Sequence, residues 1–235
     1  VKCSKIFSGY CDKKGCNRKH ATGEDIVYGT IPGDEPKIGD AYDCKVTVNG
    51  GFTERFYYLG NDGENAFLIA NKNSGNNQTF CFNTRNKNTE GPGAAYLDLP
   101  STDEWNHPGL ISPGTRKATT IAGTYYTSGG EIQSFTYTGR AARFLTASEI
   151  KQACGITIGD TKTGEMDSCE WLLESIDQFE TSSGSVGYWL ETPREGNSTG
   201  AWGVSGDYSR GSQHGVRGCD RNGVRPVITI SKYGL

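Results

Sequence analysis

The sequence of 235 residues contains no run of about 18 apolar residues, so it predicts no helix that crosses a membrane. Its first residues, VKCSKIF, lack the apolar stretch of a secretory signal, and we expect any exporting or anchoring segment to lie outside these residues. Positive charge is also scarce. The 24 Lys and Arg residues stand against 27 Asp and Glu, without the broad positive field that holds a nucleic-acid backbone. We therefore expect no nucleic-acid partner, and membrane attachment only through a segment absent from this chain.

Familiar catalytic and nucleotide-binding motifs are missing as well. The sequence has no G-x-S-x-G elbow, no G-x-x-x-x-G-K-[ST] loop and no G-x-G-x-x-G turn. With three histidines, a Ser-His-Asp arrangement would need His107 or His214 as its base. We interpret His107, which precedes Pro108, as a turn residue and His214 as a loop contact. The sequence thus predicts neither a catalytic centre nor a cofactor.

Two groups of residues carry metal-binding side chains without a recognised spacing. The first has the pattern C-x7-C-x4-C-x3-H, which matches no common structural zinc site, and comprises Cys3, Cys11, Cys16 and His20. The second is acidic but fits no EF-hand, and comprises Asp34, Glu35, Asp40 and Asp43. We expect a solvated loop at the acidic group and no metal ion at either.

What the sequence does have is an even number of cysteines, none of them in a C-x-x-C pair. The eight are Cys3, Cys11, Cys16, Cys44, Cys81, Cys154, Cys169 and Cys219. We interpret them as disulfide partners in an oxidising compartment, the alternative being buried thiols of a cytosolic protein. A bridge between Cys154 and Cys169 would close a loop of about 16 residues and contribute about 3 kcal/mol to stability.

The composition favours a folded, loop-rich chain, because Gly accounts for 33 residues and aromatic residues for 11%. We divide it into an irregular, Cys-rich segment (1–45) packed on a domain formed by residues 46–235. Within the domain, β-branched and aromatic runs predict strands over 45–48, 54–59, 66–70, 187–193, 201–204 and 223–230. The Asn-rich segment 71–92 and the polar connections within 194–222 are expected to be surface loops.

Helix signals are few. Thr146 and Glu149 form a capping box, which predicts a helix over 147–154. A short helix around 103–105, capped by Ser101 or Thr102, would end quickly at His107-Pro108-Gly109, and another is expected over 170–176.

An ordered set of motifs resembles a known family. GYWLETP, AWGVSG and NGVRPVITIS, with ARFLTASEI and CGITIGDTKTGEMDSC upstream, resemble the C-type-lectin-fold domains of bacterial surface proteins, some of them fused to a pilin-like helix. These domains are relatives of the formylglycine-generating-enzyme-like branch, which includes the variable proteins of diversity-generating retroelements. The resemblance covers roughly residues 28 to 235. It implies an α+β domain of C-type lectin fold: a twisted antiparallel sheet with two main helices, long loops and disulfides.

The resemblance also implies where a ligand would bind. In such variable proteins the ligand surface is built on the C-terminal strands and their connections, where adenine-directed mutagenesis changes codons. Here that stretch is 194–222, rich in the products of such codons, although an ordinary polar Gly/Ser-rich loop would have a similar composition. The expected ligand-binding residues are Arg194, Glu195, Asn197, Ser205, Tyr208, Arg210, Ser212, His214, Arg217, Asp220, Arg221 and Asn222.

Other residues near this stretch are expected to be structural. Trp189 and Trp202 lie within apolar strands and should pack in the core, and Arg225 should act as a hydrogen-bond hub. The strings Glu191-Thr192-Pro193 and Trp202-Gly203-Val204 lack the oxygen ligands of calcium-dependent sugar lectins.

We therefore expect an extracellular, cell-surface recognition or adhesion protein whose partner is a protein or glycan on another cell or phage. One alternative is an oxidoreductase similar to the formylglycine-generating enzyme, with Cys219 activated by Arg217 and Arg221. A structural Cys81–Cys219 bridge is the more economical interpretation. The other alternative is a pilus-associated structural subunit without a ligand.

Overall fold

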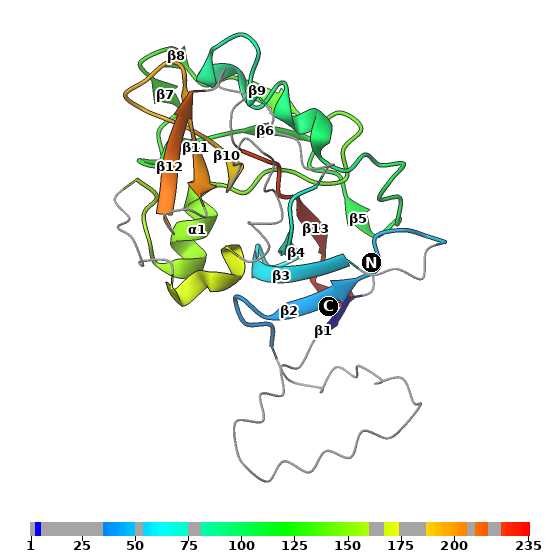
Figure 1. The fold of residues 1–235 in the computed structure, drawn as a ribbon. Coiled ribbons are helices and arrows are strands. Elements are labelled where there is room, and N and C mark those ends of the chain that lie inside the picture. Colours follow the sequence, from blue (N-terminus) through cyan, green and yellow to red (C-terminus); the bar gives the residue numbers. More distant parts are fainter. Residues whose placement is uncertain are drawn as a thin grey trace, which may run out of the picture.

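The computed structural model describes residues 3–5, 35–49, 54–74, 81–159, 167–173, 187–205, 210–215 and 222–235. Its largest element is a six-stranded antiparallel sheet with the order β1-β2-β3-β4-β13-β5. The strands are β1 (Cys3–Lys5), β2 (Ala41–Cys44), β3 (Glu54–Asn61), β4 (Asn65–Ala70), β13 (Val227–Ser231) and β5 (Leu110–Ile111). The first and last strands of the chain thus belong to one sheet (Figure 1).

The hairpin of β3 and β4 confirms the strands predicted over 54–59 and 66–70. The Asp62 carboxylate closes its turn by accepting hydrogen bonds from the backbone N–H groups of Glu64 (3.0 Å) and Asn65 (2.7 Å). The predicted strand over 45–48 is wrong, because the strand lies earlier, at β2. There the alternation of the sequence buries Tyr42 and Cys44, and Cys44 is bonded to Cys3 on β1.

The segment expected to be irregular therefore contributes strands at both of its ends, β1 and β2. Residues 6–34, which include Cys11, Cys16, His20 and Asp34, lie outside the described part of the chain.

A second antiparallel sheet consists of β10 (Gly187–Pro193), β11 (Gly200–Ser205) and β12 (Arg210–Gly215). The predictions for β10 and for most of β11 are confirmed. β12 corrects the expectation of a loop, because all six of its residues pair with β11. Two small hairpin-like pairs complete the sheets: β6 (Thr115–Lys117) with β9 (Ser134–Thr136), and β7 (Tyr126–Thr127) with β8 (Gly130–Glu131).

The helix predicted over 147–154 is confirmed as α1 (Ala147–Cys154), including its capping box. Thr146 accepts the Glu149 backbone N–H, and Glu149 accepts the Thr146 backbone N–H. The helix ends at Gly155, whose φ of 72° is left-handed, and its last residue Cys154 is bonded to Cys169 as expected. Figure 1 shows α1 between the two larger sheets, and it contacts β3 and β10.

The two main helices implied by the resemblance are not both found, since α1 is the one α-helix of the described residues. The other helical turns are short 3₁₀ segments: η1 (Asn88–Glu90), η2 (Ala95–Asp98), η3 (Asp167–Leu172) and η5 (Lys232–Gly234). η3 covers the start of the helix predicted over 170–176, and a kink at the disulfide-bonded Cys169 lies directly before that range. Residues 174–176 are not described. Around 103–105 the Ser101 and Glu104 cap holds a single turn. The described part of the chain is thus mostly sheet with one α-helix, loosely an α+β arrangement.

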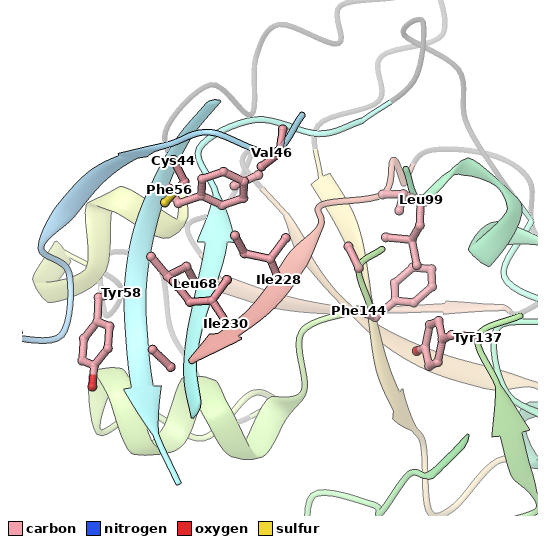
Figure 2. Packing of buried hydrophobic residues seen from close by; sticks show 14 of the residues in the cluster. Cys44, Val46, Phe56, Tyr58, Leu68, Leu99, Tyr137, Phe144, Ile228 and Ile230 are labelled. Atoms are coloured by element: carbon pink, nitrogen blue, oxygen red, sulfur yellow. The ribbon is translucent and has the colours of Figure 1, made fainter. Parts of the chain in front are cut away.

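The core lies on both faces of the six-stranded sheet, because β3 is buried on both sides. Phe56 and Tyr58 face one cluster, in which Figure 2 shows Leu68 and Ile228 on the neighbouring strands β4 and β13. Tyr57 and the other face pack against α1 and the second sheet. Within the described part of the chain, no helix is long and apolar enough to cross a membrane.

Three structural predictions near β10 are confirmed. Trp189 and Trp202 are buried in the core. Arg225, 1% exposed, donates hydrogen bonds to the carbonyl oxygens of Leu172 and Asn71 and lies 5.1 Å from the ring centroid of Tyr188. Arg225 therefore joins η3 to the segment that follows β4, as a hub rather than as a ligand contact.

Candidate ligand-binding surface

The turn between β10 and β11, residues 194–199, is closed by its own polar groups. The Asn197 carboxamide oxygen accepts hydrogen bonds from the Thr199 backbone N–H (2.7 Å) and hydroxyl (2.8 Å). At the base of the turn, the Arg194 backbone N–H donates to the Gly200 carbonyl (3.0 Å). Three of the expected ligand-binding residues, Arg194, Glu195 and Asn197, lie here and are half-buried.

A buried asparagine from a distant segment fastens this turn. The Asn88 side-chain NH₂ lies within hydrogen-bond distance of the carbonyl oxygens of Arg194 (2.9 Å), Asn197 (2.5 Å) and Gly200 (2.8 Å). Its backbone N–H donates to the Ser198 carbonyl (2.9 Å). Since Asn88 is 1% exposed, its buried NH₂ is satisfied by these carbonyl oxygens rather than by water.

Asn88 belongs to the segment 71–92, which was expected to be a surface loop. That expectation is wrong for part of it, because Phe82, Asn83, Asn88 and Thr89 are buried. Here the polar side chains turn inward to pair with backbone groups. The abundance of Asn was visible in the sequence, but no local pattern distinguishes a buried Asn from a solvated one.

The hairpin of β7 and β8 packs against the same turn. The Ser128 backbone N–H donates to the Glu195 carbonyl (2.8 Å), and the Thr127 hydroxyl donates to Asn88 Oδ1 (3.2 Å). At Gly129 an added Cβ would lie 2.9 Å from the Ser198 Cβ, so a side chain there would have to push the turn away. The Glu195 carboxylate accepts the Ala122 backbone N–H (2.9 Å) and so ties a second loop to the turn.

Two tyrosines of this hairpin region are exposed and were not anticipated from the sequence. Tyr125 is 47% exposed and Tyr126 is 63% exposed. The Lys117 ammonium lies 5.0 Å from the Tyr125 ring centroid and forms an ion pair with Glu131 (2.6 Å). Residues 125–131 and 194–199 are together called the turn–hairpin surface below. The run YYTSGG was the available signal, because Tyr with Ser and Gly is typical of binding loops.

Strand β12 brings further expected residues to the second sheet. Arg210, Ser212 and His214 lie on β12, and Ser205 at the end of β11 pairs with Arg210. At the other end of the pairing, Gly215 lies opposite Gly200, the residue at which β11 begins after the turn. Figure 1 accordingly shows β7, β8 and one end of β12 in the same region of the molecule. The remaining expected residues Tyr208, Arg217, Asp220 and Arg221 lie outside the described part of the chain.

Asn222 was expected to be a ligand-binding residue, but the structure places it in the interior. It is 2% exposed, and its side-chain oxygen and nitrogen lie 2.9 Å and 2.8 Å from where Cβ atoms on Gly187 and Gly203 would be. Asn222 therefore belongs to the interior of the second sheet and not to an exposed surface.

Two residues of the acidic group considered as a metal site form ion pairs with basic side chains. Asp40 pairs with Lys5 (2.8 Å) and Asp43 with Arg55 (2.7 Å). His107 is confirmed as a turn residue, since its Nδ1 accepts the Gly109 backbone N–H (3.0 Å). Burial, and then the positive charge of Lys45, lower the pKa of His107.

Two ion pairs that include buried side chains lie beside β10 and stabilise it. Glu191, 3% exposed, pairs with Arg116 (3.0 Å), and Arg143, also 3% exposed, pairs with Glu149 (2.5 Å). Burial, and then the negative charge of Glu191, raise the pKa of Tyr137 well above its usual value. These groups link β6, α1 and β10, so the strand that leads into the turn is held at several points.

The disulfides in the described part of the chain include Cys3–Cys44 and Cys154–Cys169, and Cys81 is also disulfide-bonded. Cys219, the expected partner of Cys81, lies outside the described residues. Disulfides persist in oxidising compartments, which favours a location outside the cytoplasm.

Comparison of the chain with protein-family models, with curated proteins and with solved structures finds no match.

Proposed function

We propose that this chain is an extracellular recognition or adhesion domain whose ligand contacts the turn–hairpin surface and β12. The observation that carries the proposal is the fastening of residues 194–199 by Asn88, beside two exposed tyrosines. Binding loops held in place before the ligand arrives lose less conformational entropy on binding. A buried asparagine whose NH₂ lies within hydrogen-bond distance of three carbonyl oxygens of a surface turn provides that preorganisation.

The side chains on this surface suit recognition of a protein or a glycan. Tyr125 and Tyr126 offer rigid aromatic area with few rotatable bonds. Arg194 adds a planar guanidinium, which forms no hydrogen bond or ion pair with any described residue. Ser, Thr, Gly and Asn supply adaptable hydrogen bonding around these anchors.

The proposal extends to the fold family of the domain and to the way in which its surface varies. The scaffold is a C-type-lectin-like domain displayed on a cell surface, and its segment 194–222 is diversified by a retroelement. Its support is the ordered motifs of the sequence, together with a β10–β11–β12 sheet that includes Ser205, Arg210, Ser212 and His214 of that segment.

Binding to a glycan array and to a panel of immobilised bacterial surface proteins tests the proposal. The double variant Tyr126→Ser/Arg194→Ser should weaken any specific binding by about tenfold or more, as expected when contact anchors are truncated. Tyr233→Ser is the matched control, because Tyr233 is 85% exposed but lies on η5, which follows β13. Unchanged affinity of the double variant, or an equal loss in the control, would show that the ligand binds elsewhere.

A further inference from the structure

A separate cavity of about 370 Å³ lies between the end of β4, η2 and the turn at 101–105. None of its lining residues belongs to the turn–hairpin surface. Its volume falls within the range of small-molecule sites, at about 300–1,000 Å³. Apolar groups form part of its wall: Leu97, Leu99, Pro100, Trp105 and Pro226. Trp105 meets the ring of Phe56 edge to face at 5.7 Å and lines the cavity as well.

The ionisable groups that line this cavity are Glu54, Asp98, Glu104 and Lys72, so negative charge prevails. Two of the carboxylates are engaged. Glu54 pairs with the Lys72 ammonium (3.4 Å), and Glu104 accepts the Ser101 backbone N–H (2.9 Å) and hydroxyl (3.0 Å).

Asp98 differs from its neighbours. Its half-buried carboxylate forms no hydrogen bond or ion pair with any residue that the structure describes. Arg140 acts on it only at longer range, since that guanidinium donates to the Leu99 carbonyl (2.9 Å) and lies over the Tyr96 ring. Burial raises the pKa of Asp98 and the positive charge of Arg140 opposes this, in keeping with a carboxylate that has lost water without gaining a close partner.

Asn73 lines the same cavity and also carries an acceptor without a partner. Asn73 is 6% exposed, and its side-chain NH₂ donates to the Gly187 carbonyl (3.2 Å). Its Oδ1 is buried and has no hydrogen-bond partner among the described residues. Buried polar atoms are nearly always paired in folded proteins, so an unpaired oxygen next to a cavity points to a donor that enters it.

Two of the donors that line the cavity already have acceptors. The Ser74 hydroxyl lies within hydrogen-bond distance of the carbonyl oxygens of Asp98 (2.7 Å) and Val224 (3.3 Å), and Lys72 is paired with Glu54. A neutral sugar needs donors as well as acceptors, whereas an ammonium only donates. A cation is also attracted to the face of a Trp ring.

We propose that this cavity binds a primary ammonium group on a short apolar stem, such as a lysine side chain or a free alkylamine. The ammonium lies between Asp98 and Asn73, and the stem lies along Trp105 and Pro226. This site is independent of the turn–hairpin surface.

The test is a titration of the ¹⁵N-labelled chain with n-butylammonium, followed by NMR at the Trp105 indole N–H and the Asn73 side-chain NH₂. Both signals should shift and saturate. 1-Butanol, of similar size but neutral, should bind about tenfold more weakly, as expected when a charged donor is lost. Equal affinity for 1-butanol, no saturable shift, or a stronger response to methyl glucoside would overturn the proposal.

Two variants separate the site from its surroundings. Asp98→Asn should weaken n-butylammonium binding by about tenfold. Asp103→Asn is the matched control, because Asp103 is an exposed carboxylate near the same turn that does not line the cavity. An unchanged affinity in Asp98→Asn contradicts the proposal, and if that variant does not fold, the comparison of the two probes on the unaltered chain decides.

Discussion

Asn88 and Arg194 are 106 positions apart in the sequence, yet the side chain of one donates a 2.9 Å hydrogen bond to the backbone carbonyl of the other. This contact joins η1 to the half-buried turn at 194–199, which follows β10. An interior residue therefore fixes the backbone of residues 194–199, and the side chains of Glu195 and Asn197 fix it further by accepting the backbone N–H groups of Ala122 and Thr199.

Asn88→Ala should destabilise the fold by about 2–4 kcal/mol, because the carbonyl oxygens of Arg194, Asn197 and Gly200 lose their contacts with the side-chain NH₂ at once. Urea unfolding under oxidising conditions measures the change, and hydrogen exchange should show faster exchange at residues 194–200. Asn106→Ala is the control. The Asn106 side chain is exposed and accepts one hydrogen bond, from the Val48 backbone N–H. If both variants lose the same stability, the fastening role of Asn88 is wrong.

The Arg143–Glu149 ion pair makes the free energy of unfolding depend on pH. Burial disfavours the charged form of Glu149, but the charge and hydrogen bonds of Arg143, with those of Thr146, outweigh it and lower the pKa below the ordinary 4.5. The folded state therefore binds this proton less readily than the unfolded chain. The stabilisation is present above pH 4.5 and is lost as the pH falls through the lower, folded-state pKa.

Glu149→Gln should consequently cost about 3–5 kcal/mol at pH 7, because it leaves the buried Arg143 charge without its partner. The difference from the unaltered chain should shrink as the pH is lowered below 4.5. Urea unfolding measured from neutral to acidic pH gives both values. Glu170→Gln, at an exposed carboxylate, should show neither effect, and a pH-independent difference for Glu149→Gln would contradict the ionic explanation.

Burial decides which positions of the candidate surface can vary. Sequencing of the coding segment across a population of the source organism should show substitutions at half-buried Arg194 and at the β12 positions Arg210, Ser212 and His214. Asn222 should stay constant, because it is 2% exposed and fills the space beside Gly187 and Gly203. Variation at Asn222 as free as at Arg194 would remove the structural basis for the diversified surface.

The elements that the sequence predicts correctly are those whose signals are local. The capping box of Thr146 and Glu149 starts α1, and the β-branched and aromatic runs around Phe56 and Leu68 mark β3 and β4. Each signal lies within a few residues of its element, so the prediction depends little on contacts with distant parts of the chain.

The misplaced or missed elements depend on distant partners. The run RGSQHG of β12 has no hydrophobic alternation, and it is a strand because β11 supplies the pairing. The strand predicted over 45–48 is displaced to β2 because Cys44 is tied to Cys3. Asn88 is not distinguishable in the sequence because its role exists only once the turn at 194–199 is folded against it.

Disulfide mapping separates a scaffold from a thiol enzyme. Peptide mass spectrometry without reduction should recover the pairs Cys3–Cys44 and Cys154–Cys169. It should also find Cys81 in a disulfide, with Cys219 as the partner expected from the sequence. Replacing Cys154 and Cys169 together by Ser should cost about 3 kcal/mol, because the unfolded chain regains the freedom of the closed loop.

A thiol titration of the denatured, unreduced protein completes this test. An oxidising scaffold that displays a binding surface leaves no titratable thiol, whereas a cysteine-dependent oxidoreductase has at least one. A reactive thiol at Cys81 would contradict its disulfide state and would leave its expected partner Cys219 without that bridge. This result would favour an oxidoreductase, because Arg217 and Arg221 flank Cys219 in the sequence and positive neighbours favour a thiolate. The absence of such a thiol, together with the two mapped bridges, would leave recognition or a purely structural role, which the Tyr126→Ser/Arg194→Ser variant then distinguishes.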